Sequence, residues 1–235
     1  MIQFKNTHIG YTVPALFTID NIVLEKNSVY ILVGENGSGK STFLRTIIKH
    51  EKILQGDILL NGKSTRGISD NSISKHVAFV STTFPQVDYL RVTEFIGMGR
   101  TPHTNALGRF SENDHRIVKE ALEKLNISKL AHKFTSELSD GERQLCAIAK
   151  AIAQETNIII LDEPTAFLDY SNKIKVLNVL KQIAIEMNKC IILSSHDIDL
   201  SINANCPFLV LNKTTTKMEF LPPPIEKEKL ILLAF

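Results

Sequence analysis

The sequence predicts an α/β fold in which a mainly parallel sheet carries flanking helices, with an N-terminal antiparallel β subdomain and an inserted α-helical subdomain. Two patterns lead to this prediction. Helical and apolar strand segments alternate from residue 140 to residue 194, as they do in parallel sheets connected by helices. In addition, the glycine-rich segment GENGSGKST, residues 34–42, joins an apolar strand to a helix.

The first 80 residues predict mostly strands. Residues 2–9, 16–24 and 29–33 have the apolar and β-branched content of strands. A helix is expected over residues 42–50. Asn61-Gly62 marks a hairpin turn after a strand at residues 58–60. A short helix at residues 73–76 leads into the apolar run 77–80, a strand buried on both faces.

Helices and polar loops replace strands between residues 81 and 137. Short helices are expected at residues 92–98 and 128–133, with a loop at residues 99–103. Ser111 and Asp114 form a capping-box-like start for a helix that ends near residue 125. We therefore predict a single domain, residues 1–235. Within it, residues 81–137 form the helical subdomain, and residues 1–80 and 138–235 form the β subdomain and the core.

The regular alternation returns after residue 138. Helices are expected at residues 140–154 and 171–188, and buried strands at residues 157–161 and 190–194. Residues 208–211 and 218–221 predict a terminal hairpin. Three prolines at positions 222–224 separate this hairpin from a charged and apolar tail.

The composition is that of an ordinary globular protein. Hydrophobic residues make up 43% and charged residues 22% of the chain, and 27 basic against 25 acidic residues leave a net charge of +2. This balance gives no electrostatic reason to expect nucleic acid as a partner. Three widely spaced cysteines suit a reducing compartment. With neither a signal peptide nor an 18-residue apolar run, we expect a cytoplasmic protein, free or attached to a membrane through partners.

The pattern Gly34-x4-Gly39-Lys40-Ser41 is that of a phosphate-binding loop, so the core is predicted to be a P-loop NTPase core. Glycines allow the backbone to turn its N–H groups inward, and the following helix adds the positive end of its dipole. Lys40 would reach the β- and γ-phosphates, and the Ser41 hydroxyl would bind Mg²⁺. The predicted nucleotide contacts in this loop are Gly34, Asn36, Gly37, Ser38, Gly39, Lys40, Ser41 and Thr42.

Three acidic or basic side chains follow buried strands, where open α/β sheets place their ligands. Asp162 could hold Mg²⁺ through water, and the adjacent Glu163 could orient or deprotonate an attacking water. A strand that simply ends at a solvated Asp-Glu pair would look the same, but the loop upstream favours the catalytic interpretation. His196 follows the strand 191–195, and we interpret it as a γ-phosphate sensor.

Two further features have simple local explanations. Ser139 and Glu142 make a capping box at a helix start, although capping and phosphate binding use the same backbone N–H groups. Tyr11 precedes Gly34 on the β-rich lead-in, where its ring could stack on an adenine. Taken alone, an ordinary core or surface tyrosine is the simpler interpretation of Tyr11.

The segments GENGSGKST, LSDGERQ, ILDEP, FLD and SSHD, in this order, resemble the ATP-binding subunits of ABC transporters over nearly the whole chain. The resemblance implies a head-to-tail dimer that encloses two ATP molecules with Mg²⁺. Ser139, Gly141 and Gln144 of one copy would face the γ-phosphate held by Lys40 of the other. Glu163 would match the catalytic base, Asp169 the dimer-contact aspartate, His196 the switch histidine and Tyr11 the adenine-stacking aromatic.

A narrower resemblance rests on residues 95–103, FIGMGRTPH, followed by the acidic start of a helix. It is similar to importers of iron–siderophore, haem and cobalamin, and importers of free metal ions share parts of it. The resemblance implies membrane permease subunits as partners, a substrate-binding protein as an indirect partner, and a position on the inner face of the membrane.

The chain departs from the family pattern at one important place. The family usually has Gln soon after the strand at residues 77–80, roughly where Thr82 stands. Either Gln86 reaches back to Mg²⁺ and the attacking water, or Thr82 substitutes with a shorter hydroxyl. At a second place, Asn27 stands where the family commonly has Gly; Asn tolerates the left-handed conformation.

Three other functions fit the sequence less well. A soluble ABC ATPase of DNA repair or ribosomes usually carries long coiled-coil insertions or two cassettes, and neither is present. A regulatory module without turnover is disfavoured because Lys40, Asp162, Glu163 and His196 are all intact. A GTPase is disfavoured because Thr215 stands where the guanine-reading motif needs Asp.

Overall fold

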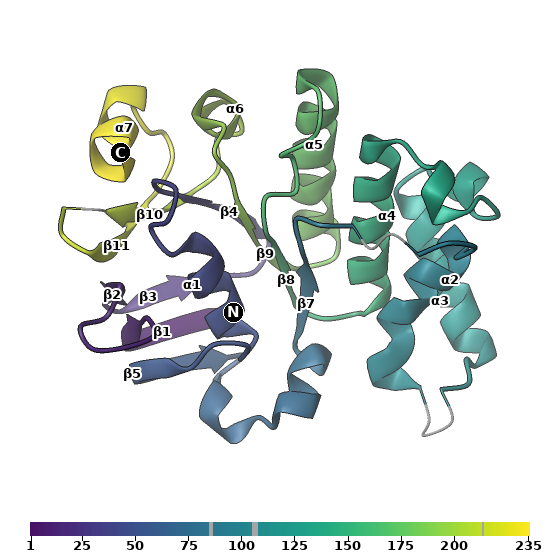
Figure 1. Ribbon diagram of the computed structural model, residues 1–235, viewed down its shortest axis with the longest axis horizontal. Helices are drawn as coiled ribbons and strands as arrows, with labels where there is room; N and C mark the ends of the chain where they lie inside the picture. Colours follow the sequence, from purple (N-terminus) through teal and green to yellow (C-terminus); the bar gives the residue numbers. More distant parts are fainter. Residues whose placement is uncertain (85–86, 105–107, 213) are drawn as a thin grey trace.

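The computed structural model describes residues 1–84, 87–104, 108–212 and 214–235. The described strands join into one mixed sheet, and helices cover both of its faces (Figure 1). In chain order the strands are β1 (Ile2–Ile9), β2 (Phe17–Ile19), β3 (Ile22–Leu24), β4 (Ser28–Val33), β5 (Ile53–Leu60), β6 (Lys63–Ser64), β7 (Val77–Val80), β8 (Ile158–Leu161), β9 (Cys190–Ser194), β10 (Phe208–Asn212) and β11 (Lys217–Leu221).

The described α-helices vary in length from 6 to 17 residues. They are α1 (Lys40–Ile47), α2 (Val92–Gly97), α3 (Glu112–Lys124), α4 (Asp140–Ala153), α5 (Tyr170–Glu186), α6 (Ile198–Asn203) and α7 (Lys227–Ala234). Short 3₁₀ segments connect several of them, namely η1 (Thr65–Gly67), η2 (Asp70–Lys75), η3 (Met98–His103), η4 (Ser128–Leu130) and η5 (Thr135–Glu137). The predicted loop at residues 99–103 is thus a 3₁₀ segment, and α6 and the helix in the C-terminal tail were not predicted.

The parallel half of the sheet has the order β10-β4-β9-β8-β7, as the alternation of helices and strands predicted. Each of these strands ends at the same edge. Residues that follow β4, β8 and β9 therefore meet there, and these are the glycine-rich loop, the Asp-Glu pair and the segment that contains His196.

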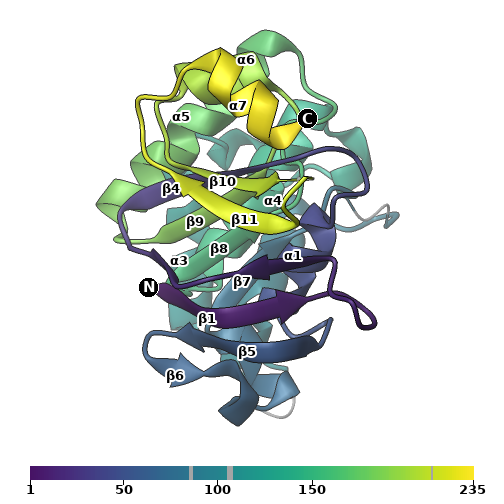
Figure 2. The same ribbon diagram turned by 90° about the vertical axis from the view of Figure 1, so that its left-hand side faces the viewer.

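The antiparallel half is built around β1, which pairs with β2, β3 and β5. It joins the parallel half through a parallel contact between β2 and β11, and Figure 2 shows β1, β5 and β6 at the end opposite α6 and α7. The prediction of one strand over residues 16–24 was wrong in one respect. The chain leaves the ladder at Asp20 and Asn21, because β2 and β3 pair with opposite ends of β1.

Two hydrophobic cores lie on the two faces of the parallel strands, and alternate residues of each strand are divided between them. In β4, for example, Ile31 and Val33 pack into the core shared with α2 to α5 and α7, whereas Leu32 packs into the core shared with α1 and β1. Phe43 of α1 contacts the rings of Phe4 and Phe17 in that second core. This packing fixes α1, and with it the loop that precedes it.

The helices α2 and α3 lie together at one end of the molecule, against α4 and far from β1 and β5 (Figure 1). Ser111 caps α3 in a capping box with Asp114, as predicted. The division into subdomains at residues 81 and 138 stays a prediction. Among the described residues, no helix combines the length and the apolar character needed to cross a bilayer.

Candidate active site

The glycine-rich loop leaves β4 at Gly34 and enters α1 at Lys40. Gly39 is the N-cap of α1 with φ +101°, a left-handed conformation that favours glycine, and a Cβ there would lie 3.0 Å from the Phe17 ring. No described side chain caps α1. Its first backbone N–H groups are therefore available to an anion, with the helix dipole pointing the same way.

Lys40 is folded back into the loop. Its ammonium group donates hydrogen bonds to the carbonyls of Gly34 and Glu35, at 2.7 and 2.9 Å, and the residue is only 6% exposed. Burial lowers the pKa of Lys40, while the nearby carboxylates of Glu163 and Asp162 act in the opposite direction. The Lys40 ammonium group thus lies between two carbonyls of the loop and the carboxylates at the end of β8.

Asp162 and Glu163 sit at the end of β8, tied to the neighbouring strand. Ser194, which is fully buried at the end of β9, donates from Oγ to Asp162 Oδ1 at 2.8 Å and accepts from the Glu163 amide at 2.7 Å. Glu163 adopts φ +49°, a conformation that non-glycine residues rarely take and that this bond helps to hold. Thr82 Oγ1 donates to the Asp162 carbonyl at 3.0 Å.

His196 completes the group, because its Nε2 lies 2.5 Å from Glu163 Oε1. Glu163 and His196 line one cavity of about 370 Å³ together with residues of the loop and of the segment before β2. Its other lining residues are Tyr11, Leu16, Asn36, Gly37, Gly39, Lys40, Ser41 and Thr42. The structure therefore brings three predicted motifs, 34–42, 162–163 and 196, to one place.

Tyr11 stands beside the loop, with its hydroxyl 3.1 Å from Thr42 Oγ1 and its side chain 62% exposed. A ring held there and open to solvent is available for stacking on a purine. Ser38 Oγ is buried and has no hydrogen-bond partner among the described residues. Such a hydroxyl is available to a ligand in the loop.

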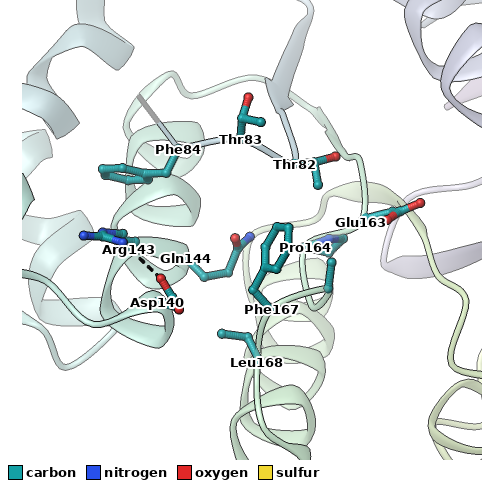
Figure 3. Close-up of a pocket in the computed structure, with 11 residues that line it drawn as sticks. Thr82, Thr83, Phe84, Asp140, Arg143, Gln144, Glu163, Pro164, Phe167 and Leu168 are labelled. Carbon is teal, nitrogen blue, oxygen red and sulfur yellow. Dashed lines mark hydrogen bonds and ion pairs between the residues drawn. The ribbon is translucent and has the colours of Figure 1, made fainter. Parts of the chain in front are cut away.

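Three residues of LSDGERQ line a different pocket from the loop. Ser139 caps α4 in the predicted capping box, in which its amide donates to Glu142 Oε2 at 2.9 Å. Asp140, Arg143 and Gln144 line a cavity of about 350 Å³ with residues 82–84, 163–164 and 166–168 (Figure 3). Ser139 and Gly141 are not among the described residues that line the phosphate-loop cavity. Within one copy, this motif and the loop do not form a common site.

Two predicted residues have local contacts that account for their positions. Asp169 caps α5 and accepts from the Asn172 amide at 2.8 Å, and its dimer-contact role stays a prediction. Gln144 points toward Phe167 and Pro164 in Figure 3, and its Nε2 is buried with no partner among the described residues. Gln86 lies outside the described residues, whereas the hydroxyl of its alternative, Thr82, is bound to the Asp162 carbonyl.

The donor set suits Mg²⁺. Ser41 lines the phosphate-loop cavity, and Ser194 orients the Asp162 carboxylate at the end of β8. Mg²⁺ typically takes one or two protein oxygens and completes its shell with substrate phosphates and water. Within the described residues, no cluster of three or more His, Cys, Asp and Glu side chains could hold a metal by itself. Phosphate oxygens of a nucleotide and water would complete a site of this kind.

The contacts of Ser194 were not predicted from the sequence, although the segment SSHD contains this residue. The sequence feature that could have indicated it is a serine at the end of a buried strand, β9, which lies beside β8. Its position opposite Asp162 depends on the pairing of Leu161 with Leu193, which places the two strand ends side by side. Sequence reasoning alone does not supply this register.

Replacing Ser194 with Ala is expected to lower turnover of a bound nucleotide by about tenfold and stability by about 1–3 kcal/mol, because it leaves the Glu163 amide without its acceptor and Asp162 Oδ1 without its donor. Steady-state phosphate release and thermal melting measure the two effects. Ser201→Ala is the matched control, since this buried serine donates to the Asp197 carbonyl in α6. Equal turnover in the two variants would remove Ser194 from a positioning role.

Comparisons with known proteins agree with this geometry. A family model described as "ABC transporter" matches residues 18–166. The iron(3+)-hydroxamate import ATP-binding protein FhuC of Bacillus subtilis (strain 168) is 33% identical over 225 residues, which cover 94% of this chain and 84% of that protein.

Two solved structures extend the comparison. One, described as a metal-chelate type ABC transporter in an inward-facing conformation, is 29% identical with a TM-score of 0.83, over 99% of this chain and 87% of that one. The other is the dimeric ATP-binding cassette MJ0796 in a post-hydrolysis state with ADP and Pi. It is 25% identical with a TM-score of 0.74, over 93% of this chain and 97% of that one.

Proposed function

The chain belongs to the ABC transporter ATP-binding family, and from this membership we propose that it is the ATP-hydrolysing subunit of an importer for iron–siderophore complexes or related metal chelates. The observation that carries the proposal is the similarity to an iron(3+)-hydroxamate import ATP-binding protein over almost the whole chain. The likeness to a metal-chelate type transporter over 99% of the chain supports it. Haem and cobalamin belong to the same proposal as alternative cargoes.

The active unit that we propose is a head-to-tail dimer with ATP as the substrate. Asp140, Arg143 and Gln144 line a different pocket from the loop that holds Lys40, and their neighbours Ser139 and Gly141 do not line the loop's pocket. In the proposed dimer, each ATP would therefore receive Ser139 and Gly141 from the second copy. The dimeric cassette with ADP and Pi supports such an arrangement. Permease subunits would attach the dimer to the inner face of the membrane, with a substrate-binding protein delivering the cargo.

Hydrolysis in this dimer would use the groups that the strand ends bring together. Lys40 would exchange the carbonyls of Gly34 and Glu35 for phosphate oxygens. Glu163, the proposed base, would take a proton from the attacking water, and His196 at 2.5 Å would orient the carboxylate and sense the γ-phosphate.

Mg²⁺, held by Ser41 and Asp162, would neutralise charge on the phosphates. Thr82 would take the place of the Gln that the family usually has after this strand, because its hydroxyl connects the segment after β7 to the Asp162 carbonyl.

Uptake of a ferric hydroxamate tests the proposal. A strain that lacks this chain should lose uptake of the ⁵⁵Fe-labelled chelate, and the wild-type chain should restore it while Glu163→Gln should not. The tagged chain should also copurify with integral membrane proteins from solubilised membranes. Normal chelate uptake in the deletion strain, with the chain recovered on ribosomes or DNA, would contradict the proposal. Loss of free manganese or zinc uptake alone would contradict the chelate cargo.

A further inference from the structure

The segment η3 lies outside the ATP site but contains a buried charge. Arg100 is only 3% exposed, although an arginine side chain keeps its positive charge in proteins. A buried guanidinium needs anionic and hydrogen-bonding partners to offset the loss of water. Its contacts therefore show which elements the structure holds together at this point.

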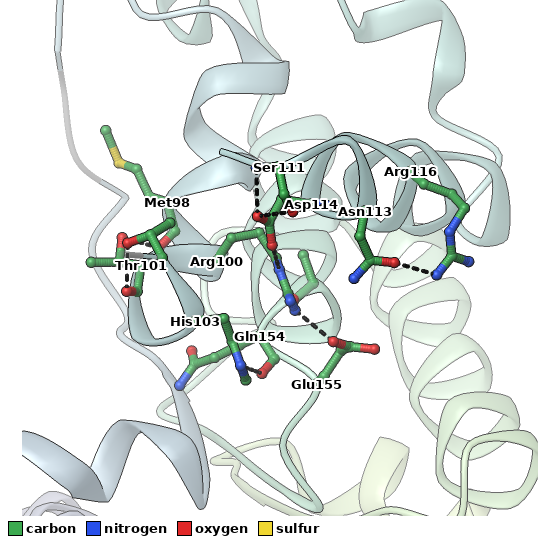
Figure 4. A network of polar contacts seen from close by, with 12 residues as sticks. Met98, Arg100, Thr101, His103, Ser111, Asn113, Asp114, Arg116, Gln154 and Glu155 are labelled. Atoms are coloured by element: carbon green, nitrogen blue, oxygen red, sulfur yellow. Dashed lines mark hydrogen bonds and ion pairs between the residues drawn. The ribbon is translucent and has the colours of Figure 1, made fainter. Parts of the chain in front are cut away.

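Arg100 joins three elements (Figure 4). Its Nε donates to Asp114 Oδ1 in the first turn of α3 at 2.8 Å. Its Nη1 donates to the carbonyl of Ala153, the last residue of α4, at 2.6 Å, and to Glu155 Oε2 just beyond at 2.7 Å. One side chain thus fastens η3, the start of α3 and the end of α4.

The acid partner is itself held in place. Asp114 Oδ2 accepts from the amide and the hydroxyl of Ser111, at 2.9 and 2.6 Å, in the capping box of α3. These bonds, together with the Arg100 guanidinium, keep the pKa of Asp114 well below its ordinary value. Asp114 stays ionised at neutral pH, so the pair with Arg100 is a permanent one.

The backbone of η3 also touches α4 directly. A Cβ on Gly99 would lie 2.3 Å from the Lys150 carbonyl, so only glycine fits at this contact. His103 Nε2 lies 2.9 Å from the Gln154 carbonyl. Gly99, Arg100 and His103 together fix the C-terminal turn of α4 against η3.

The other end of α4 carries the residues proposed to act on the partner's ATP. The helix has 14 residues, so it is a rod of about 21 Å that begins next to Ser139. Cys146, Ile148 and Ala149 are buried along it, and it packs against α2 and α3. Holding one end of such a rod sets the direction of the other.

We propose that Arg100 is a positioning residue for the half of the ATP site that acts in trans: by clamping the end of α4, it sets where Ser139 and Gly141 meet the ATP of the second copy. This inference rests on the proposed function. ATP binding by a single copy uses the loop and Tyr11, which the clamp does not touch. Loss of the contacts that Arg100 makes should therefore weaken ATP-driven dimerisation and leave ATP binding by the single copy unchanged.

The test compares Arg100→Met with its parent in a Glu163→Gln background, in which hydrolysis is blocked. Affinity of the monomer for a fluorescent ATP analogue should stay within about twofold. ATP-driven dimerisation, measured by analytical ultracentrifugation, should weaken by about tenfold or more, which corresponds to about 1.4 kcal/mol. Arg116→Met is the matched control, because Arg116 makes an exposed ion pair with Glu120 in the same subdomain; it should dimerise like the parent.

Removing Arg100 alone leaves the buried Asp114 carboxylate without its cationic partner, and an unpaired buried charge can prevent folding. The double variant Arg100→Met/Asp114→Asn removes both charges and should show the same loss of dimerisation. Dimerisation within about twofold of the parent in either folded variant would overturn the inference, as would an equal fall in monomer ATP affinity. Failure of the Glu163→Gln parent to dimerise with ATP would contradict the proposed function instead.

Discussion

Glu163→Gln is expected to lower ATP turnover by about 100-fold or more while ATP stays bound in a stable dimer. The amide matches the carboxylate in size, and its oxygen can still accept from His196, while the backbone N–H keeps its bond to Ser194. What is lost is the ability to take a proton, and general base catalysis typically contributes about 10²–10⁴-fold. ATP that is bound but not cleaved should hold the two copies together.

Phosphate release measures the turnover, and size-exclusion chromatography with ATP and Mg²⁺ measures the dimer. Glu120→Gln provides a control with the same chemical change at an exposed position on α3. The control should hydrolyse ATP like the wild type and should elute as the wild type does. Turnover near the wild-type rate in Glu163→Gln would exclude Glu163 as the base.

The features that the sequence predicted well are those set by neighbours in the chain. The capping boxes of Ser111 with Asp114 and of Ser139 with Glu142 need residues only three positions apart. The same holds for the loop between Gly34 and Ser41, whose glycines determine the local backbone. The buried strands, such as β8 and β9, were recognisable because they are apolar on both faces.

The features that the sequence did not predict depend on tertiary contacts. The break at Asp20 exists because β2 and β3 pair with different parts of β1. Ser194 matters because β9 lies beside β8 in a register that only the folded sheet fixes. Arg100 finds Asp114 across 14 residues and the end of α4 across 53, and no local pattern indicates such partners.

In the proposed head-to-tail dimer, the effect of two substitutions should depend on whether they stand on the same copy or on different copies. Each site would take Lys40 from one copy and Ser139 from the other. If Lys40→Ala and Ser139→Arg are placed on separate copies, one site of the pair collects both defects and the other site stays complete. If both changes are placed on one copy with a wild-type partner, each site contains one defect.

Pairs purified through two different affinity tags should therefore differ in turnover by about tenfold or more, with the separate arrangement the active one. A pair of wild-type and Lys40→Ala copies, which keeps one complete site, gives the reference rate. If Ser139 instead served the ATP of its own copy, the order would reverse, because the doubly substituted copy would leave its partner intact. The pockets favour the first result, since Lys40 and Asp140 line separate cavities that share Glu163. In the proposed dimer, Glu163 would thus lie where α4 of the second copy approaches the ATP.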